Sequence, residues 1–590
     1  MSDRLDPVTL EIIRNTLPAI ANEMAADLQR TSYNMMIYEV CDFCTALIDA
    51  KGRLLSQNMG GVSHFVADLG VIIQDGVARY GLEGFAPGDV IITNHQRVAG
   101  QHLNNMVIYV PIFFGGVVRA FSMTRAHWID VGGQSTGFGA TARVTDPWLE
   151  GLQLDQLKIY QGGVLDTTLH RVISDNIRFP ESSLGDLRAQ MAACKLAARR
   201  FEELLEKYGC DVVMASIEAI FAETEVMCRK VVSQIPDGEY CAESIYDDDI
   251  ITDQPIRLHA KVTVSGSDMS IDLSGCSGQT LGGLNARTYA AARIAYKALT
   301  DPQAPVNEGS FQALEAIIPE GNIMMASYPA PMGAWSLVLA TVVDTILRAL
   351  ATVIPDRIPA AHYGMAGGGV IFYGKRPGSG SKFLVQSIEG GGWGGHCDRD
   401  GESGSVSICQ GNVRNSPIES IELKNPVIVE HRKLRTDSGG PGEFRGGLGV
   451  DVRIRNLVPG RWNLSRPRRQ KCPPWGIAGG LDGGKPDFLV KLPNESEFQS
   501  VDAVGHAVPI DAETIIRTGG GGGWGDPFKR EPELVVADVA RGAVSIASAR
   551  KDYGVVIDPK RMALDPVATA ALRNRTTEPA HRELELGTVS

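Results

Sequence analysis

Residues 101–127, with the sequence QHLNNMVIYVPIFFGGVVRAFSMTRAH, decide how the N-terminal part of the chain folds. Two largely apolar runs, 107–114 and 117–124, flank the pair Gly115-Gly116. Two glycines between such runs indicate a tight turn, because glycine readily takes the positive φ that both turn positions need. The sequence therefore predicts a long β-hairpin over residues 107–124.

Two histidines lie at the open end of the predicted hairpin. His102 comes shortly before the first strand and His127 follows the returning strand, each about a dozen positions from the turn. With a carboxylate from Asp42 or Asp130 nearby, two imidazoles at one end of a hairpin suit a divalent metal site. Two hydrogen-bonded histidines beside a loop are the simpler interpretation, and the residues alone leave both open.

Outward from the hairpin, periodic apolar residues predict helices and alternating ones predict strands. Helices are expected at 7–32, 63–80, 180–232, 285–300 and 334–354, and strands at 46–55, 90–93 and 235–275. The expected organisation is an N-terminal α/β region with the candidate metal site (1–179), a helical region (180–234), an α/β region (235–359), a glycine-rich β region (360–527) and a charged C-terminal tail (528–590). The predicted fold class is mixed α/β (α+β) and multidomain, because strands and helices do not alternate regularly.

Composition excludes several classes of protein. The chain has 590 residues, of which 44% are hydrophobic and 21% charged, as in soluble globular proteins. A net charge of −12 argues against nucleic acid as a partner, since phosphate binding relies on Lys and Arg. The apolar stretch 332–355 contains Asp344 and Arg348 and is too interrupted to span a membrane. The N-terminus lacks the apolar core of a signal peptide, and ten scattered cysteines favour the reducing cytoplasm.

One segment comes close to a phosphate-binding loop. Residues 369–375 fit G-x-x-x-x-G-K, but Arg376 stands where the motif needs the hydroxyl of Ser or Thr for Mg²⁺. The spacer Val-Ile-Phe-Tyr is typical of a strand. The sequence therefore predicts a strand followed by a turn, and no nucleotide site in this chain.

Glycine is the compositional outlier, at 66 residues, and it is concentrated in the clusters 389–395, 437–447 and 519–526. Such runs allow backbones or ligands to approach closely. They could cradle an anion through their N–H groups, or serve only to pack loops between sheets. His396, Asp398 and Asp400 follow the first run and are additional candidate ligands.

Several segments between residue 6 and about residue 527 occur in the same order as in a known family. They are Asp6 to Arg14, Asp42 to Arg53, Pro87-Gly-Asp89, His102-Leu-Asn-Asn105, Arg125 to Gly133, Gly185 to Gln190, Pro319-Glu-Gly321, Arg435 to Gly440 with Phe444 to Gly447, and Gly519 to Pro527. On these segments the chain resembles the B-type component of the hydantoinase/5-oxoprolinase family, which includes the large manganese-containing subunit of acetone carboxylase. A set of this size is far more specific than any single motif.

The resemblance implies a division of labour between two kinds of subunit. A separate or fused A-type subunit, an actin-like ATPase, binds ATP and phosphorylates the carbonyl oxygen of the substrate. The B-type subunit holds the activated intermediate while water or a CO₂-derived species reacts with it. The chain is accordingly expected to work in the cytoplasm within a hetero-oligomer, with neither nucleic acid nor a membrane as partner.

The resemblance also implies a metal site. The family's ligands are an Asp in the first hairpin, a His-x-x-Asp and the His of Arg-Ala-His, which correspond here to Asp42, His102, position 105 and His127. Position 105 is Asn, whose carboxamide brings no charge, so a divalent ion (Zn or Mn) is expected to bind weakly, differently or not at all. His102, His127 and Asp130 are the expected catalytic residues.

Three functions remain open on the sequence. The first is the B-type subunit of an ATP-dependent hydrolase of a cyclic amide such as a hydantoin, 5-oxoproline or lactam. The second is the matching subunit of an ATP-dependent ketone carboxylase of the acetone or acetophenone type, which would bring a small third subunit. Asn105 shifts weight toward this second function if that branch can dispense with the metal. The third is a non-catalytic scaffold that docks the ATPase subunit.

Overall fold

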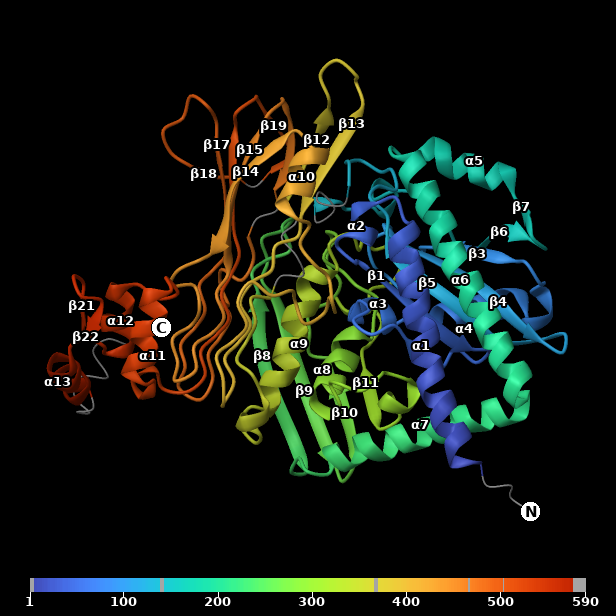
Figure 1. The fold of residues 1–590 in the computed structure, drawn as a ribbon, viewed down its shortest axis with the longest axis horizontal. Coiled ribbons are helices and arrows are strands. Elements are labelled where there is room, and N and C mark those ends of the chain that lie inside the picture. Colours follow the sequence, from blue (N-terminus) through green and yellow to red (C-terminus); the bar gives the residue numbers. More distant parts are fainter. Residues whose placement is uncertain (1–4, 138–142, 365–369, 465–466, 502, 577–590) are drawn as a thin grey trace.

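The computed structural model describes residues 5–137, 143–364, 370–464, 467–501 and 503–576. In these ranges, helices combine with five β-sheets of two to seven strands. Figure 1 shows the long helices α1, α6 and α7 on one side of the molecule and the C-terminal helices α11 and α12 at the opposite end. The predicted mixed α/β fold class is confirmed.

The predicted hairpin forms the centre of a seven-stranded sheet with the order β2-β1-β5-β4-β3-β6-β7. Its strands are β4 (Asn105–Phe114) and β5 (Val117–His127), and they pair so that Asn105 lies directly opposite His127. The two glycines between them turn with φ of 62° and 78°. The other strands are β1 (Phe43–Asp49), β2 (Leu54–Gln57), β3 (Val90–Thr93), β6 (Leu157–Gln161) and β7 (Val164–Leu165).

Long helices cover one face of this sheet. The apolar sides of α1 (Pro7–Thr31), α6 (Pro180–Tyr208) and α7 (Cys210–Val232) share a hydrophobic core with strand residues such as Leu47 and Ile108. The short helices α2 (Met35–Tyr38) and α5 (Thr167–Asn176) flank this layer. The helical segment expected at 180–232 therefore packs directly on the sheet that carries the two histidines.

Two shorter helices, α3 (Ser63–Val66) and α4 (Leu69–Tyr80), pack on the opposite face of the sheet. The sequence predicts one helix over 63–80, but the chain breaks it in two just before α4. The carboxylate of Asp68 accepts hydrogen bonds from Thr288 Oγ1 (2.5 Å) and from the backbone N–H of Tyr289 (3.1 Å). A contact with a segment more than 200 residues away interrupts the helix, which local periodicity could not indicate.

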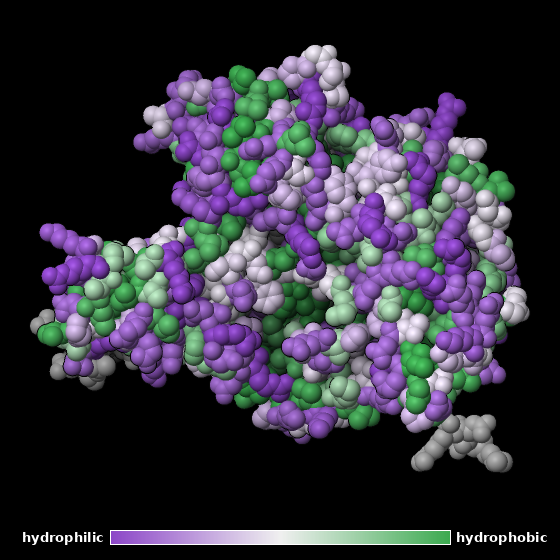
Figure 2. All heavy atoms as spheres, viewed as in Figure 1, coloured by the Kyte–Doolittle hydropathy of each residue, from purple (hydrophilic) through white to green (hydrophobic). Residues whose placement is uncertain are grey.

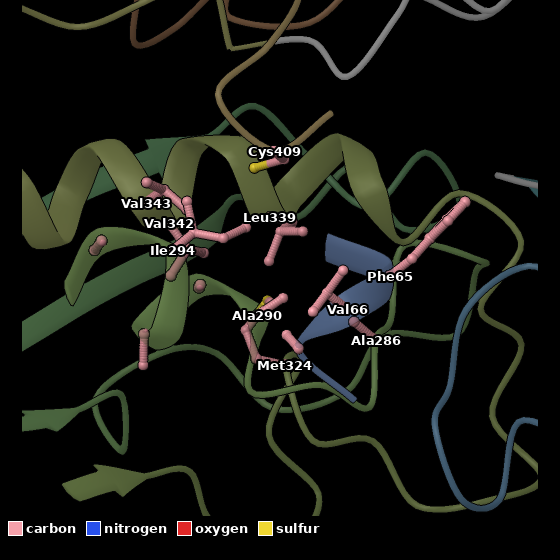
Figure 3. Packing of buried hydrophobic residues seen from close by; sticks show 14 of the residues in the cluster. Phe65, Val66, Ala286, Ala290, Ile294, Met324, Leu339, Val342, Val343 and Cys409 are labelled. Atoms are coloured by element: carbon pink, nitrogen blue, oxygen red, sulfur yellow. The ribbon is translucent and has the colours of Figure 1, made fainter. Parts of the chain in front are cut away.

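A second sheet and two helices complete this side of the core. In Figure 3, Leu339, Val342 and Val343 pack close to Ala290 and Ile294 within one buried cluster, with side chains of α3 beside them. This cluster extends to the apolar face of the second sheet, so the two sheets and the helices between them share one core. The elements involved are β8 (Gly238–Tyr246), β9 (Ile256–Ser265), β10 (Asp268–Asp272), β11 (Leu314–Ile317), α8 (Ala290–Thr300) and α9 (Ser336–Leu350).

Two further sheets form the part after residue 360, and they enclose a separate apolar core. The first, in the order β13-β12-β16-β19, contains β12 (Val370–Lys375), which confirms the strand predicted at 369–376 in place of a phosphate loop. The elements of this part are β13 (Lys382–Ser387), α10 (Ile418–Lys424), β14 (Val427–Leu434), β15 (Val450–Asn456), β16 (Gly460–Leu464), β17 (Asp487–Lys491), β18 (Gln499–Ser500), β19 (Ala503–Val508) and β20 (Glu513–Arg517).

The three glycine clusters come together as hydrogen-bonded extended segments. Gly392 N donates to Gly519 O (3.0 Å), Gly440 N to Gly521 O (2.8 Å), and Gly521 N to Gly447 O (3.0 Å). Figure 1 shows these segments side by side, between the C-terminal helices and the sheet that begins with β8. A Cβ on Gly521 would lie 1.9 Å from Trp393 O, closer than any side chain permits. The glycines are therefore packing residues, which supports the structural interpretation of these runs.

Substituting a glycine of this layer is expected to destabilise the chain strongly. Gly521→Ala forces two backbones apart, and overpacking of this kind costs about 3 kcal/mol or more when the obstacle is rigid backbone. Gly278→Ala is the matched control, because its nearest atom, Gly321 O, would be 3.6 Å from the new Cβ. Thermal unfolding should show a large loss of Tm for the first variant only. Equal behaviour of the two variants would contradict the packing role.

The C-terminal region, which the sequence analysis expects to be a charged tail, is folded in its described part, residues 528–576. It contains α11 (Pro532–Ala540), α12 (Ile546–Tyr553), β21 (Ile557–Asp558), β22 (Ala563–Leu564) and α13 (Pro566–Thr576) around a small core. Arg530 attaches this lobe by ion pairs with Asp400 (2.6 Å) and Asp538 (2.8 Å). Across the described ranges, no helix has the length and hydrophobicity needed to cross a membrane.

Candidate active site

The hairpin register brings the predicted residues to one end of the central sheet. Asn105 and His127 are direct cross-strand partners at the open end of β4 and β5. Asp42 immediately precedes β1, the neighbour of β5, and its carbonyl accepts a hydrogen bond from His127 N (3.1 Å). His102 lies in the loop that enters β4. Residues from three separate segments of the sequence therefore meet, as the hairpin predicts.

The two imidazoles lie against each other. The ring centroids of His102 and His127 are 4.9 Å apart and the rings are nearly perpendicular, at 88°. His127 Nδ1 lies 3.6 Å from Asp42 Oδ2, and His102 Nε2 lies 2.7 Å from Asn105 Oδ1. The ring separation is well below the roughly 8 Å beyond which one ion could not reach both rings with ligand bonds of ~2.0–2.2 Å.

The carboxamide of Asn105 is oriented by a second neighbour. Its Nδ2 donates to Gln101 Oε1 (2.8 Å), which turns its Oδ1 toward His102. Gln101 in turn donates from Nε2 to the carbonyl of His64 (2.9 Å), on α3. The chain therefore presents a carbonyl oxygen, and no charge, at the position where the family resemblance leads us to expect a carboxylate.

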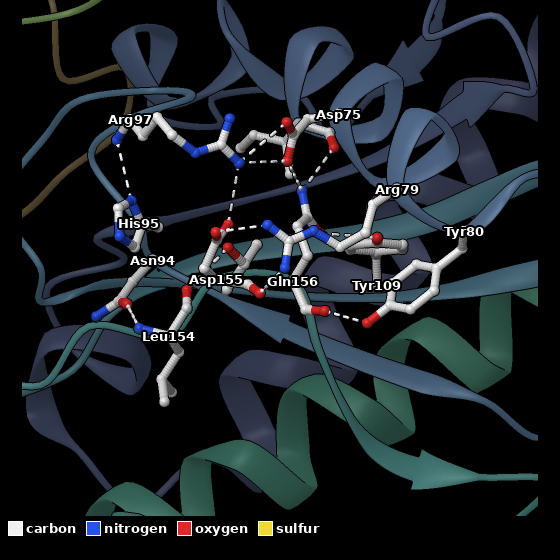
Figure 4. Close-up of polar contacts among 12 residues, drawn as sticks. Asp75, Arg79, Tyr80, Asn94, His95, Arg97, Tyr109, Leu154, Asp155 and Gln156 are labelled. Carbon is white, nitrogen blue, oxygen red and sulfur yellow. Dashed lines mark hydrogen bonds and ion pairs between the residues drawn. The ribbon is translucent and has the colours of Figure 1, made fainter. Parts of the chain in front are cut away.

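A polar network anchors the loop that carries His102 (Figure 4). Asn94 Nδ2 donates to Leu103 O (2.7 Å), and Asn94 Oδ1 accepts from Leu154 N (2.8 Å). Further along the loop, Arg97 bridges Asp75 (3.1 Å) on α4 and Asp155 (3.2 Å). Because the loop is tied at both ends, His102 has a fixed position relative to the sheet.

Helix α6 fixes the other histidine through the segment Gly185 to Gln190. Trp128 Nε1 donates to Gln190 Oε1 (2.8 Å), next to His127 in the chain. Asp186 accepts hydrogen bonds from the backbone N–H groups of Tyr33 (2.7 Å) and Asn34 (3.2 Å), and Asn34 Nδ2 donates to His127 O (3.3 Å). This segment therefore positions the end of β5 without belonging to the site itself.

Burial controls the charge of the site. Desolvation lowers the pKa of His102 to about 4 and holds the pKa of His127 well below its ordinary value, with the neighbouring His102 adding to the shift. Both imidazoles are therefore neutral at pH 7, the form that binds metals and accepts protons. Desolvation raises the pKa of Asp42 to about 7. A cation nearby would favour its ionised form.

Two buried residues that the sequence did not single out complete the surroundings. His64 of α3 is buried, and its ring lies 4.7 Å from that of Trp335, which also lies 6.3 Å from that of His102. Proximity to His102 contributes to lowering the pKa of His64. Arg125 lies two residues before His127, so both side chains point to the same face of β5. The alternation of side chains along a strand predicts that Arg125 shares a face with His127. The sequence does not indicate that α3 packs beside the two histidines.

Asp130 does not join the histidines. Its buried carboxylate accepts hydrogen bonds from Arg178 Nη1 (2.9 Å) and Arg178 N (2.9 Å), and from the backbone N–H groups of Gly132 (3.1 Å) and Gly137 (3.2 Å). Four donors occupy its oxygens and fix the loop after β5. The structure therefore removes Asp130 from the candidate catalytic set and gives it a structural role.

The residues of the hairpin end suit a divalent ion, although they are not a closed ligand set. Two neutral imidazoles, the Asp42 carboxylate and the Asn105 carbonyl oxygen are the donor types that Zn and Mn take. However, the described residues place three His, Cys, Asp or Glu ligand atoms mutually within 4.8 Å only at His396, Cys397 and Asp398. The ligand atoms of Asp42, His102 and His127 would have to move closer together around an ion, and His102 Nε2 would have to give up its hydrogen bond with Asn105 Oδ1.

The additional candidate ligands after the first glycine run, His396, Asp398 and Asp400, do not form one group. His396 Nδ1 lies 2.7 Å from Asp398 Oδ1 and 3.4 Å from Cys397 Sγ, at the surface. Asp400 instead belongs to the ion pair with Arg530. Asp398 is shared with Arg399 (3.0 Å), a cation that competes with any metal at this position.

An apolar cavity of about 450 Å³ opens on the far side of α3. It is lined by Ser63 and Val66 of α3 and the following Ala67, by Ile294 and other residues of α8, and by Trp393 from the glycine-rich part. Figure 2 shows a hydrophobic hollow near the middle of this face, where α3, α8 and α9 lie in Figure 1. The helix that contributes His64 is thus also a wall of a cavity with the volume of a small ligand.

Buried histidines beside a carboxylate inside a mixed α/β fold are typical of the active site of an enzyme. The family model of hydantoinase B/oxoprolinase matches residues 6–527, and the chain belongs to this family of enzyme subunits.

Relatives and solved structures agree over nearly the whole chain. The B-type component of a D-/L-hydantoinase from Pseudomonas sp. (strain NS671), as that protein is described, is 30% identical over 94% of this chain and 96% of its own length. The structure of the ATP-dependent caprolactamase from Pseudomonas jessenii superposes with a TM-score of 0.89 at 26% identity, over 97% of this chain and all of that one. Acetone carboxylase, at 18% identity and a TM-score of 0.86 over 100% of this chain and 85% of that one, shares the fold.

Proposed function

We propose that the chain is the B-type subunit of an ATP-dependent cyclic amide hydrolase that acts on a substrate phosphorylated by an actin-like ATPase partner. The observation that carries this proposal is the buried group of His102, His127 and Asp42 at the hairpin end. Relatives named as subunits of a hydantoinase and of a caprolactamase, at 30% and 28% identity, favour a cyclic amide over a ketone. The apolar cavity beside α3 has room for a small ring.

In this proposal the chain's own residues handle protons and position the activated substrate. A neutral imidazole in a buried site can accept a proton from an attacking water, and Asp42 at 3.6 Å can stabilise the imidazolium that forms on His127. Burial of the whole site excludes bulk water, so a reactive phosphorylated intermediate is protected from unproductive hydrolysis. Asp42, His102, Asn105 and His127 are the residues that would hold a divalent ion, which when bound supplies Lewis-acid polarisation of an oxygen.

The purified chain alone is expected neither to hydrolyse ATP nor to open a cyclic amide. The reason is that residues 370–375 form strand β12, so a phosphate-binding loop does not occupy these positions. The measurement is phosphate release and ring opening with hydantoin, 5-oxoproline and caprolactam, first for the chain alone and then with the ATPase subunit added. Activity is expected only in the reconstituted complex. Vigorous ATP hydrolysis by the single chain would contradict the division of labour.

The same reconstitution decides between the alternatives. A ketone carboxylase would consume bicarbonate and acetone or acetophenone instead of a cyclic amide, and would require a small third subunit. A scaffold would leave product formation intact when His102 or His127 is replaced. Asn105 is the feature that keeps the carboxylase under consideration, since the missing carboxylate weakens the case for a bound ion.

A further inference from the structure

Arg125 carries a buried positive charge that makes no ion pair with a carboxylate of the described residues. Its side chain is in the core, with 2% of the residue exposed. Nη2 makes one long hydrogen bond to Ala99 O (3.4 Å), and neither Nε nor Nη1 has a hydrogen-bond partner among the described residues. A guanidinium stays protonated in proteins, so Arg125 is charged at pH 7. A buried charge without a partner is costly and is rarely kept without a purpose.

The other buried arginines show that this is an exception in the chain. Five arginines are buried in the described ranges, and four of them pair with a carboxylate. Arg468 pairs with Asp248 (3.0 Å), Arg469 with Asp344 (2.8 Å), Arg530 with Asp400 (2.6 Å), and Arg445 approaches Asp538 (3.6 Å). Arg125 is the fifth, and its contact is instead the ring of Phe65, 5.5 Å from the guanidinium carbon.

The position of Arg125 connects it to the histidine site. It lies on the same face of β5 as His127, and its partner across β1 is Cys44. It lies near enough for its charge to act on both His102 and His64. The charge of the Asp68 carboxylate also acts on Arg125, but this carboxylate already accepts hydrogen bonds from Thr288 Oγ1 and Tyr289 N.

We infer that Arg125 binds an oxyanion, a phosphate or carboxylate group of a small molecule held beside His102 and His127. A guanidinium offers charge-assisted hydrogen bonds that suit such oxygens, and in a desolvated site these are stronger than in water. Asn105 in place of a carboxylate leaves less negative charge in the same site to compete for Arg125. The inference deepens the proposed function, because the bound molecule would be the substrate of that site.

Inorganic anions test this inference on the full chain without substrate or partner. After EDTA treatment and removal of the chelator, titration calorimetry measures binding of inorganic phosphate and, separately, of acetate. We expect the parent to bind at least one of them and Arg125→Met to bind it at least tenfold more weakly, since a hydrogen bond to a charged group contributes about one to two factors of ten. Arg125→Lys, which keeps the charge, should retain part of the affinity.

The two anions identify the source of the oxyanion. Binding of phosphate alone indicates a phosphoryl group, binding of acetate alone a carboxylate, and binding of both an oxyanion site without preference. Absence of binding to the parent, or equal affinities of parent and Arg125→Met, would overturn the inference. Because no ATPase partner is involved, failure of the complex to open a cyclic amide would leave this result untouched.

Stability provides an independent readout. If Arg125 serves a ligand, Arg125→Met removes an uncompensated charge, and the Tm of the ligand-free chain should stay the same or rise by about 1–2 °C. Arg530→Met, the control, removes a buried arginine that bridges Asp400 and Asp538, and its Tm should fall. A fall for Arg125→Met as large as that for the control, or its failure to fold, would show that Arg125 is a structural residue and would overturn the inference.

Discussion

His127→Ala is expected to lower kcat/KM for ring opening by the reconstituted complex by at least about 100-fold, the usual contribution of a positioned acid or base. His127 is buried between His102 and Asp42, and its neutral ring is both a metal ligand type and a proton acceptor. Either role disappears with the imidazole. ATP consumption by the partner should continue, because in the proposed function the substrate is phosphorylated on the other subunit. The variant is therefore expected to consume ATP without forming product.

The control for this experiment is His170→Ala on α5, a helix outside the hairpin end. Its kcat/KM should stay within about twofold of the parent, as for surface substitutions away from special features. Size-exclusion chromatography of both complexes verifies assembly, so that a loss of product cannot be confused with a loss of the partner. Normal product formation by His127→Ala would refute the site and favour the scaffold function.

The hairpin and its histidines could be predicted because the information is local. Two glycines between apolar runs fix the turn, and the alternation of β4 and β5 then places Asn105 opposite His127. The register of the hairpin alone therefore places Asn105 and His127 together at its open end. Asp130 lies beyond the end of β5, where alternation no longer determines direction, and its true partner, Arg178, is 48 residues away. The sequence near Asp130 therefore gives no sign that its carboxylate binds Arg178 instead of facing the histidines.

The parts that the sequence did not reveal depend on tertiary contacts. Asp68 breaks the helix expected at 63–80 because Thr288 lies beside it, and the resulting short α3 places His64 near His102. The glycine clusters were recognisable as sites of close backbone approach, but which runs pair with which follows only from the packing of Gly392, Gly447 and Gly521. The absence of an ion pair at Arg125 is likewise invisible in a sequence, since it depends on Asp68 bonding to Thr288 and the backbone instead.

The second large effect is expected from Asn105→Asp, which should tighten binding of Mn or Zn by about 10- to 100-fold, or roughly 1.4–2.8 kcal/mol. The new carboxylate would lie where Asn105 Oδ1 now lies, 2.7 Å from His102 Nε2, and would add one negative charge to a desolvated site. The gain is limited because a buried carboxylate is costly when no ion is present, and because the hydrogen bond from Asn105 Nδ2 to Gln101 Oε1 is lost. The metal-free variant should therefore be less stable than the parent.

Elemental analysis after matched dialysis measures this effect directly, with Asn104→Asp as the control. Asn104 is the adjacent residue, but its Nδ2 donates to Trp128 O (2.8 Å), so an acid there adds the same charge without facing His102 and should recruit no ion.

Activity then separates the two enzyme functions. A hydrolase that uses a metal should keep or gain turnover with Asn105→Asp, because a bound ion lowers the pKa of water. A carboxylase that works without metal should lose turnover, because the added charge repels an anionic phosphorylated intermediate. If parent and Asn105→Asp bind equally little metal, Asp42, His102 and His127 are not metal ligands in this chain, and the two imidazoles act on the substrate directly.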